Sequence, residues 1–284
     1  MPTHWDAELG DLDSIVERAL TEDLAAGDVT ARSTVPAGTR ARARLVAKAV
    51  LVVCGLPVAE RVFARLDPAV AFTAAVADGT RVVRGATIAT IEGDARALLG
   101  AERTALNLVQ RMSGIATATA RFVQAAGGRC RVTDTRKTMP GLRALDRYAV
   151  RTGGGHNHRN DLGAGVLIKE NHIRAAGGIT AAVRAAKQHA PHTMRIECEV
   201  TNLPEVDEAL AAGADAILLD NMDDDAVRDA VARIGKRAIV EVSGNVDLAR
   251  TGVLSELGVD LVSVGALTHS VVAADISLLF ETAP

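Results

Sequence analysis

The feature that most constrains the fold is a series of evenly spaced apolar segments in the second half of the chain. Four of them end at Glu199, Asp220, Ser243 and Gly265, which are 21, 23 and 22 residues apart, and helical stretches lie between them. That interval accommodates one strand and the helix that returns the chain to the start of the next strand. The pattern predicts a parallel α/β barrel or a doubly wound sheet. In either architecture ligands bind at the carboxyl ends of the strands, so these residues, with Lys169, should converge.

The first hundred residues have a different pattern. Alternating segments rich in Val, Ile and Thr flank a turn at Asp78-Gly79, which is typical of antiparallel strands. We therefore predict an amino-terminal α+β domain over residues 1–103, to which residues 272–284 return, and a barrel domain over 104–271. Hydrophobic residues make up 48% of the chain and aromatic residues only 2%, which suits a core of small aliphatic side chains in an α/β protein.

Composition also excludes several classes of protein. The three cysteines are odd in number and far apart, without a metal-binding spacing, which favours a reduced compartment. Residues 1–8 lack the basic start and apolar run of a signal peptide, and no stretch approaches the roughly 18 apolar residues of a membrane span. A net charge of −3 argues against nucleic-acid binding. We expect a cytoplasmic protein without a membrane or nucleic-acid partner.

Positive charge is concentrated in one segment of this acidic chain. Between Arg129 and Lys169, nine Lys and Arg residues stand against three Asp residues. Arg136 and Lys137 are adjacent in a predicted loop, and a run of three glycines precedes His156, His158 and Arg159. Guanidinium and ammonium groups beside a flexible glycine backbone suit a multiply anionic ligand. A solvated basic face is the alternative interpretation.

Acidic residues follow the neighbouring strands. Glu197 and Glu199 lie on one face of their strand, and Asp220 ends the next, so these carboxylates could bind sugar hydroxyls or Mg²⁺. For Glu197 alone we favour an ion pair with a neighbouring cation inside the barrel. No nucleophilic or metal-binding triad emerges from these positions, so we expect a site that orients an anionic substrate and stabilises departing negative charge.

Motifs along nearly the whole chain resemble those of the quinolinate phosphoribosyltransferase family. They are Glu22–Leu24, Gly27–Thr30, Glu102–Asn107, Ser113-Gly114, Asp134–Thr138, Arg151–Gly155, Asn157–Arg159, Leu167–His172, Leu218–Asn221 and Val264–His269. The resemblance implies an amino-terminal α/β-sandwich domain beside an incomplete, seven-stranded α/β barrel. It also implies transfer of phosphoribosyl from phosphoribosyl pyrophosphate to quinolinate with decarboxylation, giving nicotinate mononucleotide, pyrophosphate and CO₂ in NAD biosynthesis.

The resemblance further assigns roles by motif position. The groups implied to hold the quinolinate carboxylates are Arg136, His158, Arg159 and Lys169, with Thr135 in the same substrate site. Lys137 would contact phosphoribosyl pyrophosphate, and Glu199 and Asp220 would bind ribose hydroxyls and Mg²⁺, partly through water and substrate oxygens. The implied cradle for the 5′-phosphate consists of Ser243, Gly244, Asn245, Val264, Gly265 and Ala266. The implied catalytic residues are Lys137, Lys169, Glu199 and Asp220.

In this family the residue equivalent to Arg103 reaches into the pocket of the partner subunit, which implies an obligatory homodimer, with a hexamer left open. His156 stands where an apolar residue is expected, and we treat it as a group behind the site. Two alternatives remain: a paralogue of the same fold associated with molybdenum transport operons, and a non-catalytic anion-binding protein.

Overall fold

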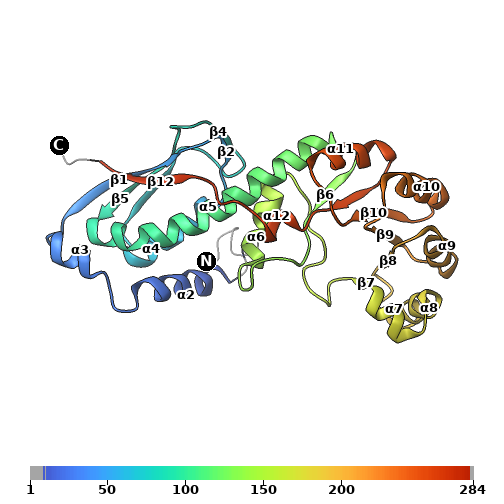
Figure 1. Ribbon diagram of the computed structural model, residues 1–284. Coiled ribbons are helices and arrows are strands. Elements are labelled where there is room, and N and C mark those ends of the chain that lie inside the picture. Colours follow the sequence, from blue (N-terminus) through green and yellow to red (C-terminus); the bar gives the residue numbers. More distant parts are fainter. Residues whose placement is uncertain (1–8, 10, 282–284) are drawn as a thin grey trace. The chain divides into compact units, whose positions relative to one another are not determined.

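A computed structural model describes residues 9 and 11–281, which form two compact units (Figure 1). The amino-terminal unit comprises the residues up to 120 together with 138–154 and those from 268 onward, and the sheet unit comprises residues 121–137 and 155–267. The domain boundary expected near residue 103 stays a prediction. Residues 1–8, on which the signal-peptide argument rests, lie outside the described residues.

The amino-terminal unit is built on a four-stranded antiparallel sheet in the order β12-β1-β5-β3. These strands span Ile276–Phe280, Arg40–Ala47, Thr87–Asp94 and Ala71–Ala74, and a separate pair joins β2 (Leu51–Val52) to β4 (Arg81–Val82). The helices of the unit are α2 (Leu12–Leu24), α3 (Val29–Thr34), α4 (Leu56–Leu66), α6 (Arg143–Thr152) and most of α5 (Ala95–Ala126). Leu45 of β1 lies opposite Leu278 of β12 and both are buried, so β12 contributes to the core of this unit.

Asp78 organises the start of α4. Its carboxylate accepts hydrogen bonds from the main-chain N–H groups of Gly55 and Leu56, and also from the Tyr148 hydroxyl at 3.0 Å. A side chain at Gly55 would meet Met112, because an added Cβ would lie 2.8 Å from its sulfur, and the residue has φ +102°. The predicted turn at Asp78-Gly79 therefore also caps a helix.

The sheet unit contains six parallel strands in the order β6-β11-β10-β9-β8-β7 (Figure 1). They are β6 (Arg131–Thr133), β7 (Val166–Ile168), β8 (Ile196–Val200), β9 (Ala216–Asp220), β10 (Ile239–Ser243) and β11 (Leu261–Ser263). The α/β class is confirmed, and the predicted strand ends at Asp220 and Ser243 agree with the structure. Among the described residues the sheet has six strands rather than seven. A single parallel bridge from His156 to Thr133 lies beside β6, where a seventh strand would pair.

Helices alternate with these strands, and local capping explains where they begin. The helices are α7 (Glu170–Ala176), α8 (Ile179–His189), α9 (Leu203–Ala212), α10 (Asp224–Ile234), α11 (Leu248–Leu257) and the short α12 (Ala266–His269). The side chains of Asn202, Asp223 and Asp247 each accept a main-chain N–H from the first turn of α9, α10 or α11. These caps fix the short loops that leave the carboxyl ends of β8, β9 and β10. None of the described helices is long and apolar enough to cross a membrane.

Candidate active site

A cavity of about 330 Å³ opens at the carboxyl ends of the strands, and we call it the mouth cavity. Of the strands whose ends were predicted to converge, all but β8 contribute residues of the strand or of its adjoining loop to the lining. The lining residues are Thr135, Arg136, Lys137, His158, Arg159, Leu167, Lys169, Leu218, Glu241, Ser243 and Ser263. Seven of the eleven are residues that the sequence placed in the site. The loops of the parallel sheet therefore bring these distant motifs together.

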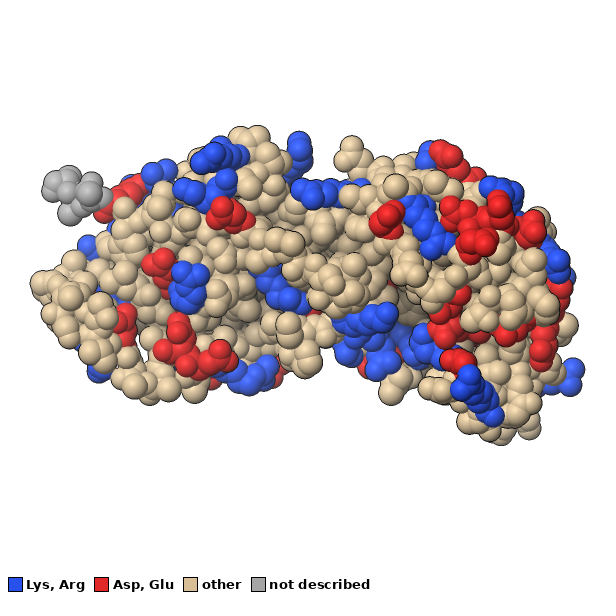
Figure 2. Space-filling model, viewed as in Figure 1, with Lys and Arg blue, Asp and Glu red and all other residues tan. Residues whose placement is uncertain are grey.

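Cations dominate this cavity. Arg136, Lys137, Arg159 and Lys169 all line it, and Figure 2 shows basic side chains gathered on the part of the face where the chain leads into β7. Partial burial lowers the pKa of Arg159, and the neighbouring Arg136 charge lowers it further. Like charges held close together in this way provide a strong attraction for a multiply anionic ligand.

Two carboxylates predicted for the site lie beside the mouth cavity without lining it. Glu199 forms an ion pair with the Lys169 ammonium, and only 13% of its side chain is exposed. Asp220, at the end of β9, pairs in register with Ser243 and accepts a hydrogen bond from the Asn221 side chain at 2.8 Å. Carboxylate oxygens are the ligands that Mg²⁺ prefers, and two of them leave most of its coordination to water and substrate oxygens. The residues therefore fit the expected metal.

The loop after β10 contains two consecutive residues with positive φ, Gly244 and Asn245. Gly244 has φ +86°, and a Cβ added there would lie 2.2 Å from the side-chain oxygen of Asn221. Asn245 and Asn221 also have positive φ angles, and the Asn245 amide donates to the Asn221 side chain at 3.2 Å. In the neighbouring loop, Val264, Gly265 and Ala266 follow β11 directly, with Val264 N–H bonded to the Thr133 carbonyl. The order of the strands places both loops at the same edge of the sheet.

The segment that carries the two histidines is fixed to β6 by Asp134, which is fully buried. Its carboxylate accepts hydrogen bonds from the main-chain N–H of His158 at 2.7 Å and from the side chain of Asn157 at 2.6 Å. The main chain of His156 bonds on both sides, to Val132 and to Asp134. His156 thus contributes through its backbone bridge and lies behind the mouth cavity. The sequence analysis quoted Asp134 only as part of a motif and missed this anchoring role.

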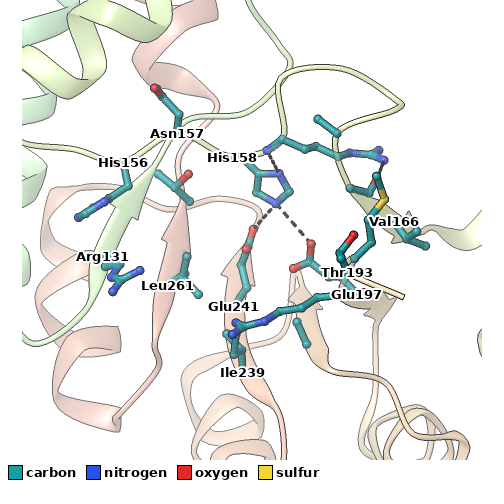
Figure 3. Close-up of a pocket in the computed structure, with 17 residues that line it drawn as sticks. Arg131, His156, Asn157, His158, Val166, Thr193, Glu197, Ile239, Glu241 and Leu261 are labelled. Atoms are coloured by element: carbon teal, nitrogen blue, oxygen red, sulfur yellow. Dashed lines mark hydrogen bonds and ion pairs between the residues drawn. The ribbon is translucent and has the colours of Figure 1, made fainter. Parts of the chain in front are cut away.

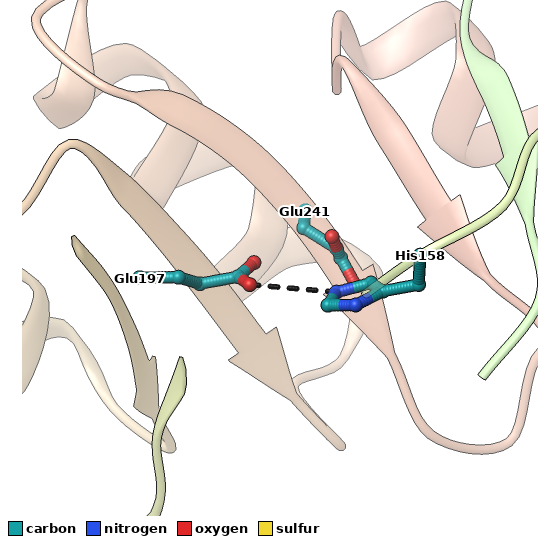
Figure 4. Close-up of side chains that lie close together, drawn as sticks. All are labelled: His158, Glu197 and Glu241. Atoms are coloured by element: carbon teal, nitrogen blue, oxygen red, sulfur yellow. Dashed lines mark ion pairs between the residues drawn. The ribbon is translucent and has the colours of Figure 1, made fainter. Parts of the chain in front are cut away.

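His158 lies between two glutamates inside the sheet unit (Figure 4). Its Nε2 atom is 3.4 Å from Glu197 and 3.5 Å from Glu241, and the Ser263 hydroxyl donates a hydrogen bond to Glu241. The partner of Glu197 is therefore the imidazole of His158, where the sequence predicted a cation. Glu241 was missed by the sequence analysis. The available signal was a glutamate in the middle of the apolar segment Ile239–Ser243, where a charged residue is rarely buried without a partner.

The two ring nitrogens of this imidazole have environments that favour opposite protonation states. Hydrogen bonds to Glu197 and Glu241 raise the pKa of His158 to about 10. Burial raises the pKa of Glu197, whereas burial of Glu241 is outweighed by hydrogen bonds from His158 and Ser263, so that its pKa is lowered. At the other ring nitrogen, Nδ1 accepts the main-chain N–H of Arg159 at 2.7 Å, and a protonated Nδ1 could not accept it. Because the backbone fixes this donor, we assign the neutral tautomer of His158, with its hydrogen on Nε2.

This tautomer bears on a second possible metal site. His158, Glu197 and Glu241 offer three ligand atoms that all lie within 4.8 Å of one another, a group that the sequence analysis did not identify. A metal on Nε2 would require the hydrogen to move to Nδ1, where the Arg159 N–H already points. The observed hydrogen bond therefore favours a proton, rather than a metal ion, between the ring and the carboxylates.

A second cavity, of about 430 Å³, lies at the opposite edge of the sheet, and we call it the base cavity (Figure 3). It is lined by the first residues of five strands, namely Arg131, Val166, Ala216, Ile239 and Leu261, together with Arg195 and His156 among others. Three residues, His158, Arg159 and Glu241, line both cavities. The histidine–glutamate group therefore separates the mouth cavity from the base cavity.

Arg103 lies outside this unit. It is an exposed residue of α5 in the amino-terminal unit, and it is absent from the residues that line either cavity of the sheet unit. Its assignment to the site of a partner subunit stays a prediction.

Comparison with known proteins agrees with this fold and these motifs. Two family profiles match: the amino-terminal domain of quinolinate phosphoribosyl transferase over residues 28–113, and its carboxyl-terminal domain over residues 115–279. A nicotinate-nucleotide pyrophosphorylase [carboxylating] of Mycobacterium leprae is 44% identical over 282 residues, covering 96% of this chain and 98% of that protein. A probable enzyme of the same name from Synechocystis is 43% identical, covering 90% and 88%.

Solved structures give the same result. NadC from Streptococcus pyogenes has a TM-score of 0.90 at 40% identity and covers 95% of this chain and 97% of its own. The nicotinate-nucleotide pyrophosphorylase from Francisella tularensis has a TM-score of 0.91 at 39% identity, covering 95% and 96%. With both profiles matched in order along nearly its whole length, the chain belongs to the quinolinate phosphoribosyltransferase family.

Proposed function

We propose that this protein transfers the phosphoribosyl group of phosphoribosyl pyrophosphate to quinolinate and decarboxylates the product, forming nicotinate mononucleotide in NAD biosynthesis. The observation that carries this proposal is the convergence of Arg136, Lys137, Arg159 and Lys169 on one cavity at the carboxyl ends of the strands. Both substrates are polyanions. Family membership selects this pair of substrates from the polyanions that such a cavity could bind. The same-fold paralogue is not favoured, because the similar proteins carry the name of this enzyme.

The reaction needs charge and orientation more than a nucleophilic side chain. The pyridine nitrogen forms a bond to C1 of the ribose while the bond from C1 to pyrophosphate breaks, and pyrophosphate leaves with the electron pair. The bond between C2 and its carboxylate then breaks, CO₂ leaves, and C2 takes up a proton. Arg136, Arg159 and Lys169 are proposed to hold the dicarboxylate, with Thr135 beside them, and Lys137 to contact the pyrophosphate. Both ring nitrogens of His158 bond within the protein, so this residue, expected on the carboxylates, is proposed to act through Arg159 instead. Holding both reactants aligned removes much of the entropic barrier to the first step.

Glu199 and Asp220 are proposed to bind the ribose hydroxyls and to hold Mg²⁺ partly through water and substrate oxygens. That ion would supply positive charge to the departing pyrophosphate. The ion pair between Lys169 and Glu199 holds the ammonium close to the predicted ribose position before substrate arrives. The left-handed turn at Gly244 and Asn245, with Ser243 before it, and the segment Val264–Ala266 are proposed to receive the 5′-phosphate through main-chain N–H groups.

We further propose a cytoplasmic homodimer in which Arg103 of each subunit completes the site of the other, with hexamers as a further possibility. Arg103 is exposed on α5, so its charge is available to a second copy of the chain. Three buried free cysteines agree with a reduced compartment.

The direct test is an assay of purified protein with quinolinate, phosphoribosyl pyrophosphate and Mg²⁺. We expect nicotinate mononucleotide and pyrophosphate to form in equal amounts. Tight binding of both substrates without release of pyrophosphate would instead indicate a non-catalytic anion-binding protein. Turnover of another pyridine or pyrimidine acid in place of quinolinate would indicate the paralogue.

A further inference from the structure

Four buried or half-buried polar side chains form a continuous group between the mouth cavity and the base cavity. Ser263 of β11 donates to Glu241 of β10, and Glu241 and Glu197 of β8 both face Nε2 of His158 (Figure 4). Only 3% of Glu241 is exposed. A carboxylate buried to this extent is costly unless its partners fix it, so this group is a rigid part of the sheet unit.

Both ring nitrogens of His158 are engaged by the protein itself. Nε2 faces the two carboxylates, and Nδ1 accepts the main-chain N–H of Arg159 at 2.7 Å. The ring therefore connects the buried glutamates to the main chain of the next residue. Arg159 is held at its other end as well, because its guanidinium donates to the carbonyl of Gly165 at 2.9 Å.

The position of the Arg159 guanidinium in the mouth cavity thus depends on two hydrogen bonds, one of them made by a ring that Glu241 orients. Arg159 stands near Arg136, whose like charge would push it away from the cavity if its main chain could move. A rotation of the His158 ring would release the Arg159 N–H and allow that movement. Glu197 and Glu241 together oppose this rotation, because both carboxylates face Nε2 of the ring.

From this geometry we infer that Glu241 is a positioning residue for the pyridine dicarboxylate: it fixes the ring of His158, which fixes the main chain of Arg159. This inference rests on the proposed function, since it takes quinolinate as the ligand of the mouth cavity. Ser263 assists by holding Glu241, and Glu197 provides the second carboxylate. A change at Glu241 should therefore affect the binding of quinolinate and not that of phosphoribosyl pyrophosphate. The second substrate is proposed to contact Lys137 and the loops after β10 and β11, and none of these takes part in the contacts from Glu241 to Arg159.

The test uses Glu241→Gln, which keeps the size of the side chain but replaces the charged acceptor of the ring N–H with an amide. We expect KM for quinolinate to rise by about tenfold, the scale of one lost charge-assisted hydrogen bond, with kcat and KM for phosphoribosyl pyrophosphate within about twofold of wild type. The matched control is Glu256→Gln, an exposed glutamate whose side chain is 72% accessible, and it should change none of these constants.

A double-mutant comparison shows whether Glu241 acts through Arg159. In an Arg159→Ala background, Glu241→Gln should have little further effect on kcat/KM for quinolinate, because the group it positions is gone. In parallel, nuclear magnetic resonance of isotope-labelled histidine should show the Nε2–H tautomer of His158 in wild type and a mixture of tautomers in Glu241→Gln. If Glu241→Gln unfolds the protein, Ser263→Ala provides the same kinetic comparison with a smaller expected rise, about threefold.

Three results would overturn the inference. One is an unchanged KM for quinolinate in Glu241→Gln; another is full additivity with Arg159→Ala. The third is a zinc ion that binds wild type with one-to-one stoichiometry in calorimetry and is lost in Glu241→Gln, because a metal on Nε2 is incompatible with the assigned tautomer. Failure of the proposed function would look different, since wild type would then form no nicotinate mononucleotide at all.

Discussion

The two cavities of the sheet unit differ in their position along the strands and in the charge of their lining. The base cavity is the larger, about 430 Å³ against about 330 Å³, and it too is lined by arginines: Arg131, Arg195 and the shared Arg159. Its lining, however, includes the first residues of five strands, which lie at the end of the sheet opposite the carboxyl ends. The mouth cavity is lined by loops at the carboxyl ends, and four cations from three segments meet there. Position in the fold and positive charge, rather than volume, therefore favour the mouth cavity as the proposed active site.

The largest expected effect comes from removing one cation from each cavity in turn and comparing the two variants. Lys169→Ala should fold but lose most activity, because a charged contact to an anionic substrate contributes about 2–4 kcal/mol to transition-state binding, or about 30-fold to 10³-fold in kcat/KM. Steady-state kinetics and a thermal melt measure both quantities. Arg131→Ala, its counterpart at the base cavity, should stay within about twofold of wild type. Near-normal turnover in Lys169→Ala, or equal losses in the two variants, would contradict the assignment.

Arg103→Ala should also be folded and nearly inactive, for the same electrostatic reason, although Arg103 lies in the other unit. Mixing the Arg103→Ala and Lys169→Ala proteins tests whether subunits share the site. One site of a mixed dimer regains both residues, so activity should recover in part. Demonstrated subunit exchange without recovery would remove the shared site from the account.

Removal of divalent metal should separate binding from turnover. With a chelator present, we expect pyrophosphate release to fall by at least about 10²-fold, because the leaving group loses its counter-charge. Quinolinate binding, which the mouth cations provide, should persist in calorimetry. Loss of quinolinate binding under the same conditions would show that the metal holds the dicarboxylate rather than the phosphates.

Gly244→Ala should have a smaller and selective effect. The added methyl group would meet the Asn221 side chain, and φ +86° disfavours any residue with a Cβ, so we expect a loss of about 1–2 kcal/mol of stability. KM for phosphoribosyl pyrophosphate should rise while KM for quinolinate stays near its wild-type value. An unchanged KM for phosphoribosyl pyrophosphate would argue against a phosphate cradle in this loop.

Many residues of the mouth cavity could be predicted from the sequence, whereas the contacts among His158, Glu197 and Glu241 could not. The regular strand spacing placed Asp220 and Ser243 correctly at strand ends, and the motif order brought Arg136, Arg159 and Lys169 to one loop cluster. Residues of this kind can be predicted from their place in the sequence directly after a strand, because all strands of a parallel sheet have their carboxyl ends at the same edge.

The contact between Glu241 and His158 depends instead on pairing across strands. Glu197 lies opposite Ala216, and Glu241 lies opposite Leu218 and Leu261, a register that no single segment of sequence specifies. The same limit explains why the partner of Glu197 was predicted only as a cation of the barrel. The expectation of seven strands came from the family resemblance; the described residues form six, with a single bridge from His156 to Thr133 beside β6.

The central claim is that the mouth cavity joins quinolinate to phosphoribosyl and then releases its 2-carboxylate. The most direct measurement is the release of labelled CO₂ from quinolinate that carries radiolabelled carbon in that carboxylate. We predict release that requires phosphoribosyl pyrophosphate, equals the pyrophosphate formed, persists in Arg131→Ala and disappears in Lys169→Ala. Labelled CO₂ released without phosphoribosyl pyrophosphate, or none released by wild type with both substrates bound, would contradict the account.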